Sequence, residues 1–164
     1  MISASIPSLT RRLAAFVYEG VLLFGVAVVT ALVFSPVVGQ RNALNFRWGL
    51  MAAVAGVFTL YFVYFWSKSG QTLAMQTWRL RVVDLQGQTL SWAQALLRSV
   101  LAWLWFMPAL LMASILDLQG STIFASLALG LGVYVLLAKL HPQQRFVHEI
   151  LSRTKVVSQA PKTA

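Results

Sequence analysis

One acidic side chain of this chain lies inside an apolar segment. Glu19 falls six residues into the run from Leu13 to Phe34, which consists mainly of Val, Leu, Ala and Phe. An ionised carboxylate at membrane depth costs about 2–3 kcal/mol or more unless a partner or water meets it. Residues of this kind either pair with other polar groups or handle protons and cations. Glu19 is therefore the first candidate for a functional residue.

The other titratable residues do not follow the spacing of a metal or hydrolytic site. His141 and His148 are seven positions apart with Pro142 between them, unlike the i, i+4 pair of a helical zinc motif. No serine lies in a nucleophile elbow, and the absence of cysteine excludes thiolate ligands, cysteine nucleophiles and disulfides. The acids are separated in the chain: Glu19, Asp84, Asp117 and Glu149. We expect no catalytic, metal-binding or cofactor-binding residues, and a protein that is not an enzyme.

The composition identifies the class of protein that must position Glu19. The chain of 164 residues is 59% hydrophobic and 10% charged, whereas soluble domains are about 45–50% apolar and 25% charged. Four runs are long enough, or nearly so, to cross a hydrocarbon core of about 30 Å as helices. They are Leu13 to Phe34, Trp48 to Trp66, Val100 to Leu116, and Ile123 to Leu140. We predict an all-α membrane protein with a four-helix transmembrane bundle, its third helix kinked at Pro108.

The basic residues indicate the orientation of these helices. The N-terminal tail, the segment between the second and third runs, and the C-terminal end hold most of them, whereas the first connection holds only Arg41 and Arg47. By the positive-inside rule we expect a multi-pass protein of a bacterial-type plasma (inner) membrane with both termini in the cytoplasm. The run after Arg11-Arg12 is long for a secretory signal, so it is predicted to be a retained span. The chain has a net charge of +9, but its lysines and arginines flank the apolar runs. We therefore expect no nucleic-acid partner.

The segment from Ser67 to Ser99 is predicted to contain secondary structure and is more than a simple linker. Gly70-Gln71-Thr72 opens a stretch in which polar residues alternate with Leu73, Met75, Trp78 and Leu80. This stretch is predicted to form a helix along the membrane surface, and Arg81 to Asp84 a short strand. Ser91 with Gln94 three residues later is a capping box, so a helix should begin near Trp92 and continue through Arg98.

The C-terminal region repeats this pattern. Gln143 to Ser152 is predicted to be helical, and Arg153 to Val157 resembles Arg79 to Val83. The two stretches either pair as a small two-stranded sheet beneath the bundle or are similar by chance. Ser158 to Ala164 is predicted to be a disordered tail.

Five short stretches, in their order and spacing, resemble a known family. They are Arg11-Arg12-Leu13-Ala14-Ala15-Phe16, Gly70-Gln71-Thr72-Leu73, Leu80-Arg81-Val82-Val83-Asp84, Leu90-Ser91-Trp92-Ala93-Gln94-Ala95-Leu96-Leu97-Arg98, and His148-Glu149 followed by Thr154-Lys155-Val156-Val157. The chain resembles the RDD family of small integral membrane proteins, named for an arginine and two aspartates. The resemblance implies a single domain over residues 7–157 with a charged set of Arg12, Glu19 and Glu149.

Three positions depart from the family pattern that this resemblance implies. Glu19 and Glu149 stand where the family has aspartates, which keeps the charge and both acceptor oxygens but adds a methylene. Met75 stands where the family usually has a basic residue.

The charged set has three further candidate partners, Arg98, Arg145 and His148. We predict a network at the cytoplasmic membrane edge in which Glu19 and Glu149 accept hydrogen bonds from Arg12, Arg98 and His148. Two interpretations remain open, because intramembrane charges usually pair with one another but also mark ion pathways. The network either locks the bundle or makes Glu19 a proton or cation site.

Two functional hypotheses follow. The preferred one is a structural, accessory or scaffold protein of the bilayer, whose basic cytoplasmic face docks anionic lipid or a membrane-protein partner. The alternative is a small transporter, with cation/proton exchange at Glu19, because some RDD family members are thought to be cation/proton antiporters. Four short spans leave little room for a pathway in one protomer, so transport would require a homo-oligomer.

Overall fold

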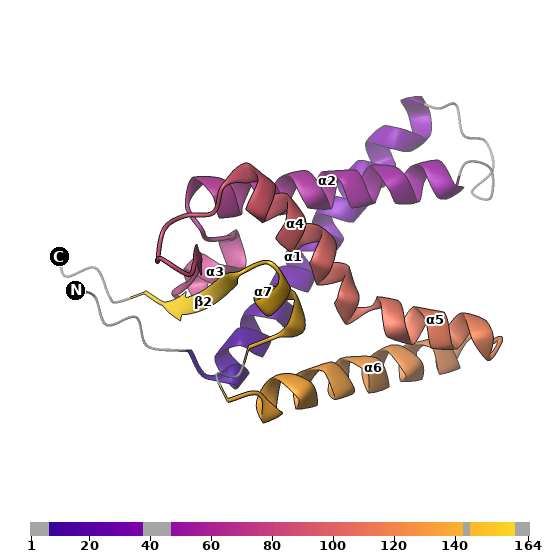
Figure 1. Cartoon of the computed structure of the whole chain (residues 1–164). Helices are drawn as coiled ribbons and strands as arrows, with labels where there is room; N and C mark the ends of the chain where they lie inside the picture. Colours follow the sequence, from indigo (N-terminus) through magenta and orange to yellow (C-terminus); the bar gives the residue numbers. More distant parts are fainter. Residues whose placement is uncertain (1–6, 38–46, 143–144, 160–164) are drawn as a thin grey trace.

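The computed structural model describes residues 7–37, 47–142 and 145–159. Helices dominate it, and a two-stranded sheet lies at one end (Figure 1). The elements in chain order are α1 (Leu9–Val37), α2 (Arg47–Lys68), α3 (Leu73–Thr77), β1 (Leu80–Asp84), α4 (Trp92–Ala102), η1 (Trp103–Trp105), α5 (Met107–Ile115), α6 (Ser121–Leu140), α7 (Val147–Leu151) and β2 (Thr154–Ser158).

Four helical segments are long and apolar enough to cross a membrane. They are Leu9–Pro36, Trp48–Lys68, Trp92–Ile115 and Ser121–Leu140. Their outward faces carry large apolar side chains, such as Phe24, Ile115 and Phe124, each more than 70% exposed. Because such surfaces are stable only against lipid or another apolar surface, the predicted all-α membrane protein with four spans is confirmed.

The helix of the third predicted span begins before the apolar run. α4 starts at Trp92, after the Ser91–Gln94 capping box, and continues through Arg98 into the apolar region, as predicted. The helix is then interrupted by the 3₁₀ turn η1, and α5 restarts at Met107. Pro108 occupies the first turn of α5, where its missing N–H leaves no intrahelical bond unmade. The predicted kink is therefore a break just before the proline.

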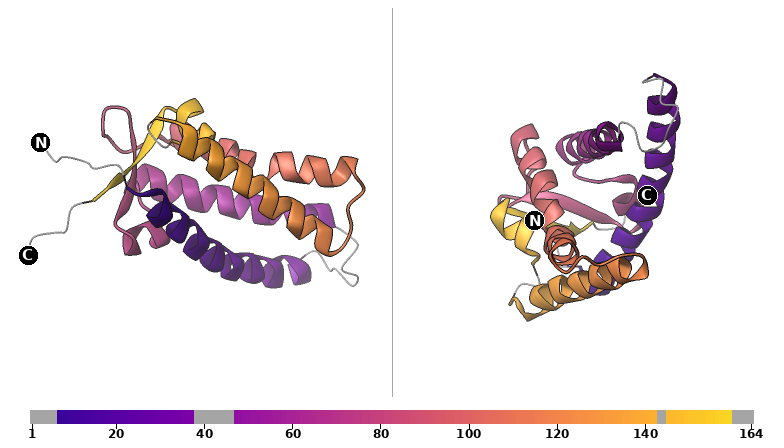
Figure 2. Two further views of the ribbon diagram at one scale, coloured as in Figure 1. Left: turned by 90° about the horizontal axis from the view of Figure 1, so that it is seen from below. Right: turned by 90° about the vertical axis from the view of Figure 1, so that its right-hand side faces the viewer.

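The long helices lie side by side and extend from the sheet end of the molecule (Figure 2, left). α2 packs against α1 and α4, and α5 packs against α6. In Figure 1 the α5–α6 pair diverges from α2 beyond the break in the third span. The bundle is therefore closed at the sheet end and more open towards its far end.

The two short strands pair antiparallel, which confirms the predicted sheet. Arg81 is opposite Val157, and Val83 is opposite Lys155. Each strand follows a five-residue helix through a tight turn whose arginine has a positive φ, 51° at Arg79 and 53° at Arg153. The two strands are thus entered through the same local geometry.

The C-terminal limits differ from the prediction in part. Ser158 is the last residue of β2, so it belongs to the sheet rather than to the predicted tail, whose residues 160–164 lie outside the described residues. Strand pairing with β1 extends the ordered chain by this residue. The predicted helix from Gln143 to Ser152 is longer than α7, which spans Val147–Leu151. Residues 143–144 lie outside the described ranges, whereas Arg145 and Phe146 are not helical, because Phe146 is the extended N-cap.

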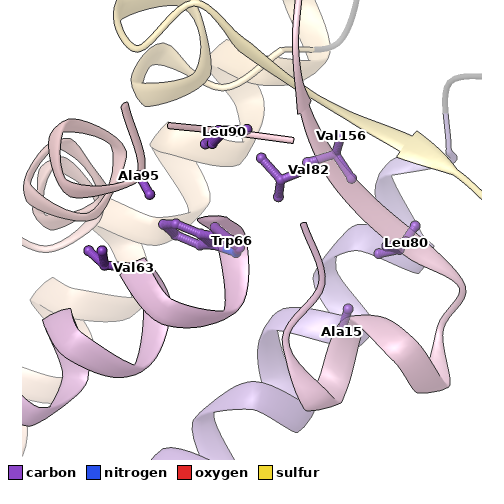
Figure 3. Packing of buried hydrophobic residues seen from close by; sticks show 8 residues of the cluster. All are labelled: Ala15, Val63, Trp66, Leu80, Val82, Leu90, Ala95 and Val156. Atoms are coloured by element: carbon purple, nitrogen blue, oxygen red, sulfur yellow. The ribbon is translucent and has the colours of Figure 1, made fainter. Parts of the chain in front are cut away.

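A hydrophobic cluster fixes the sheet to the bundle. It joins α1, α2, both strands and α4, and its buried members are Ala15, Val63, Trp66, Leu80, Val82, Leu90, Ala95 and Val156. In Figure 3 the indole of Trp66 extends from α2 into the middle of this cluster. The cluster therefore holds the polar residues near the ends of α1 and α4 against the strands.

Candidate functional site

A buried ionic cluster joins three helices at the sheet end. Oε1 of Glu149 in α7 lies 2.5 Å from Nη2 of Arg12 in α1 and 3.3 Å from Nη2 of Arg98 in α4. Each of the three residues is less than 10% exposed. One carboxylate is thus shared by two guanidinium groups, an arrangement that offsets the desolvation of all three charges.

Neutral groups complete the coordination of this cluster. The second oxygen of Glu149 accepts a hydrogen bond of 3.2 Å from the backbone N–H of Phe146, the residue that precedes α7. Arg98 Nη1 donates to Thr154 Oγ1 of β2 at 2.5 Å. The Arg12 guanidinium lies 4.5 Å from the ring centroid of Phe146, and that of Arg98 lies 5.0 Å from the ring of Trp66. The cluster therefore connects five elements, α1, α2, α4, α7 and β2, through their side chains.

Glu19 occupies a separate polar site. Its Oε1 accepts a hydrogen bond of 2.7 Å from the Tyr61 hydroxyl of α2, and its Oε2 accepts one from the Thr72 hydroxyl. Thr72 is also the N-cap of α3, where its Oγ1 accepts from the backbone N–H of Met75. Glu19 is 7% exposed. Two hydroxyl groups from different elements thus hold a single carboxylate.

The predicted network is wrong for Glu19, whose hydrogen bonds go to hydroxyls and not to Arg12 or Arg98. Seven residues along a helix correspond to about 10 Å, and the Arg12 side chain is directed at Glu149 instead. Tyr61 and Thr72 were not among the residues predicted from the sequence to contact Glu19. An N-cap pattern at Thr72, which precedes a short helical segment, was the available signal.

His148 also departs from its predicted role. Its Nδ1 accepts a hydrogen bond of 3.0 Å from the indole N–H of Trp105, and the Tyr134 hydroxyl lies 3.1 Å from the same nitrogen. Burial, together with the positive charges of Arg98 and Arg12, holds the pKa of His148 well below its ordinary value of 6.5. His148 is thus a neutral acceptor of an aromatic cluster, rather than a donor to the carboxylates.

Arg145 takes no part in the ion pairs found among the described residues. It is half-buried and precedes α7. Of the six residues singled out in the sequence, four lie together around α7: Arg12, Arg98, His148 and Glu149. Glu19 and Arg145 form no hydrogen bond with these four in the described residues.

An apolar cleft connects the two polar sites. Its volume is about 660 Å³, and its lining includes Glu19 as well as Arg12, Arg98, His148 and Glu149. Most of the remaining lining is aliphatic or aromatic and belongs to α1, α2, α4 and η1, with Leu110 of α5 and Leu127 of α6. The cleft therefore has one polar end, near the sheet, and apolar walls along the helices. In residues 7–37, 47–142 and 145–159 no group of three or more His, Asp or Glu side chains gathers at a metal-binding distance.

Comparisons with known proteins agree with the motif order found in the sequence. The model of the RDD family matches residues 6–153. No curated protein and no solved structure matches the chain. The family match covers far more than half of the 164 residues and includes both polar sites and the sheet up to its second strand. This multi-pass membrane protein belongs to the RDD family.

Proposed function

We propose that this protein is a structural or accessory membrane protein, a scaffold that presents a basic cytoplasmic face, and not an enzyme. The observation that supports this proposal is the sharing of the Glu149 carboxylate by Arg12 and Arg98 while all three side chains are buried. Breaking a buried pair of this kind typically costs about 3–5 kcal/mol. Charges held in this way are suited to fixing the ends of helices together.

The basic face lies on the two strands and the turns that lead into them. It consists of Arg79, Arg81, Arg153 and Lys155, all at least partly exposed, and Asp84 is the one acid within the strands. Each lysine or arginine near a membrane surface attracts anionic lipid with about 1 kcal/mol. The face therefore suits the anionic headgroups of the cytoplasmic leaflet, or an acidic surface of a membrane-protein partner.

The proposed orientation follows from this face. The sheet end lies on the cytoplasmic side of a bacterial-type plasma membrane, in keeping with the positive-inside rule. The side chain of Arg11, at the start of α1, donates to Trp78 O at 2.7 Å and to Ser158 Oγ at 3.4 Å. The beginning of the first span and the end of the second strand therefore belong to the same side of the membrane.

Lipid preference tests the scaffold. In nanodiscs, we expect phosphatidylglycerol to raise the thermal midpoint of the parent above its value in phosphatidylcholine. Replacing Arg79 and Arg153 together by glutamine should remove most of this difference. Arg47→Gln, at the opposite end of α2, is the matched control and should leave the difference unchanged. Equal midpoints of the parent in the two lipids would contradict a lipid-docking face.

A second candidate function is cation/proton exchange by a homo-oligomer, and the position of Glu19 favours it. A carboxylate that lines an apolar cleft and is bonded to the hydroxyls of Tyr61 and Thr72 has groups at hand for proton transfer. Ion flux in proteoliposomes decides between the two candidates, with sodium and potassium tested separately across a proton gradient. The scaffold predicts no flux above empty liposomes. Flux that Glu19→Gln abolishes at unchanged thermal stability would establish exchange instead.

A further inference from the structure

Two buried polar side chains line the apolar cleft with an atom that makes no hydrogen bond. Ser99 and His148 are only 6% and 5% exposed, and both belong to the lining of the cleft. Within the described part of the chain, neither Ser99 Oγ nor His148 Nε2 has a hydrogen-bond partner. The fully enclosed side-chain nitrogens that lack a partner belong to other residues, Trp66, Arg81 and Arg98. The two atoms therefore have accessible surface, and this surface faces the cleft.

The contacts of His148 determine which of its ring nitrogens carries the hydrogen. The indole N–H of Trp105 donates to His148 Nδ1 at 3.0 Å, so Nδ1 is the acceptor of the ring. In a neutral imidazole with an acceptor at Nδ1, the hydrogen is on Nε2. His148 thus offers an N–H donor to the cleft, and Ser99 offers a hydroxyl that can also donate. An acceptor oxygen in the cleft would satisfy both groups.

The charged groups at this end of the cleft are engaged with other groups of the protein. Arg12 and Arg98 pair with the carboxylate of Glu149, and the Glu19 carboxylate accepts from two hydroxyls. The groups left for a ligand are therefore a neutral imidazole and a hydroxyl. A carbonyl oxygen, which accepts hydrogen bonds without carrying a charge, is the group that suits them.

Aromatic side chains form the wall beside these donors. The ring centroid of Trp105 lies 5.9 Å from that of His148 and 4.5 Å from that of Phe16. Phe106 continues the series at 6.4 Å from Phe16. These four residues all line the cleft. Because aromatic rings pack favourably against one another, with faces offset or edge to face, this wall favours a flat ring in the ligand.

The rest of the cleft is apolar and elongated. Its volume of about 660 Å³ lies within the range of about 300–1,000 Å³ typical of ligand pockets. Along α1 the lining continues from Phe16 to Ala27, a length of about 16 Å at 1.5 Å per residue. Gly20 is part of this lining, and a Cβ atom there would meet nothing within 4 Å. A flexible apolar tail can therefore extend from the aromatic wall along the helix.

We propose that this cleft binds an isoprenoid quinone, whose ring carbonyls accept from His148 Nε2 and Ser99 Oγ and whose tail lies along α1. A quinone is flat and uncharged, has carbonyl acceptors, and dissolves in the bilayer through its tail. A diacylglycerol has carbonyl groups but no ring, and a phospholipid adds a charge for which the free donors offer no opposite charge. The site concerns binding alone, requires no ion flux and is independent of the lipid-docking face.

Equilibrium binding of radiolabelled decylubiquinone to the protein in phosphatidylcholine nanodiscs tests this site, with empty nanodiscs subtracted. We expect saturable binding that unlabelled decylubiquinone displaces. Dioleoylglycerol and phosphatidylglycerol should each displace it at least tenfold less well. Displacement by either lipid at the same concentration as decylubiquinone would assign the cleft to acyl lipids and overturn the proposal. Binding no greater than that of empty nanodiscs would overturn it as well.

Removing one donor tests the head of the site. Ser99→Ala removes the hydroxyl from the cleft, so the affinity for decylubiquinone should fall about fivefold. Ser126→Ala is the matched control, because Ser126 is also a buried helical serine, 7% exposed, but its hydroxyl donates to Ile123 O and does not line the cleft. The control should bind as the parent does. Equal affinity of folded Ser99→Ala and Ser126→Ala would contradict the proposed carbonyl contact.

Filling the cleft tests the tail. Gly20→Leu places an apolar side chain in the lining and should weaken decylubiquinone binding at least tenfold. Gly25→Leu is the control, because Gly25 is on the same helix, has equally open surroundings and does not line the cleft. Thermal midpoints within a few degrees of the parent show that both variants are folded. Parental affinity in folded Gly20→Leu would place the bound quinone elsewhere and overturn the site.

Discussion

Arg12 and Glu149 are 137 residues apart in the chain, yet Nη2 of Arg12 lies 2.5 Å from Oε1 of Glu149. The first residue is near the start of the first span, and the second is in the short helix before the last strand. Arg98, at 3.3 Å from the same oxygen, adds the third span. The ionic cluster therefore closes the bundle at the sheet end, where the first and last elements meet.

Glu149→Gln should destabilise the protein strongly. The substitution leaves Arg12 and Arg98 buried without an opposing charge, which typically costs about 3–5 kcal/mol. For a protein of this length, such a loss lowers the thermal midpoint by about 10 °C. Thermal unfolding of the purified protein in a neutral detergent measures this change.

The matched control for this variant is Arg145→Gln, on the residue next to Phe146. Arg145 takes no part in the ion pairs of the described chain, so its variant should unfold within about 2 °C of the parent. If Glu149→Gln is as stable as Arg145→Gln, the cluster does not hold the bundle together.

Gly130→Ala should separate α5 from α6. A Cβ atom at Gly130 would lie 2.7 Å from the Cβ of Ala109, and overpacking of this kind costs about 1–3 kcal/mol. Gly132→Ala is the matched control, because a Cβ there meets no other atom within 4 Å. Both changes raise helix propensity equally, so a lower midpoint confined to Gly130→Ala is expected. Equal midpoints for the two variants would show that α5 and α6 are not in close contact.

The elements that the sequence predicted correctly depend on local signals. The four spans follow from continuous apolar runs, and the start of α4 follows from the Ser91–Gln94 capping box. The pairing of the two strands was predicted from two similar stretches, each of which needs hydrogen-bond partners for its backbone N–H and C=O groups.

The partners of the charged residues were harder to predict, because they depend on tertiary contacts. Glu19 is paired with the neutral hydroxyls of Tyr61 and Thr72, which carry no charge signal in the sequence. His148 accepts from Trp105, in a 3₁₀ turn that no sequence pattern marked. The charged residues around Glu149 could thus be recognised in the sequence, but their contacts could not.

Met75→Lys should create a partner for Glu19. Met75 lines the same cleft, and its backbone N–H donates to the Thr72 hydroxyl that also bonds Glu19. A lysine there can cover the apolar wall with its stem while its ammonium reaches the carboxylate. We expect a higher thermal midpoint in the parent background and a lower one in the Glu19→Gln background, where the new charge is unpaired.

A double-mutant cycle measures this coupling, which should be about 0.5–3 kcal/mol. Leu73→Lys, on the same short helix at a position that is 47% exposed, is the control and should show no coupling to Glu19. If the coupling of Met75→Lys to Glu19 is no larger than that of Leu73→Lys, the ammonium introduced at position 75 does not reach the Glu19 carboxylate.

His148 should make the stability fall on mild acidification. The folded state keeps this imidazole neutral, because burial and the charges of Arg98 and Arg12 lower its pKa well below 6.5. The unfolded chain binds a proton there near pH 6.5, so it holds more protons than the folded chain below that pH. The free energy of unfolding contributed by His148 is therefore fully present above about pH 6.5 and decreases as the pH falls below it.

His148→Gln keeps an acceptor for the Trp105 indole but cannot titrate. Comparing thermal midpoints of the two proteins from pH 8 to pH 5 measures the effect: the parent should lose stability below about pH 6.5 more steeply than the variant. Parallel curves would show that His148 binds a proton equally well in the folded and unfolded protein, and would contradict its lowered pKa.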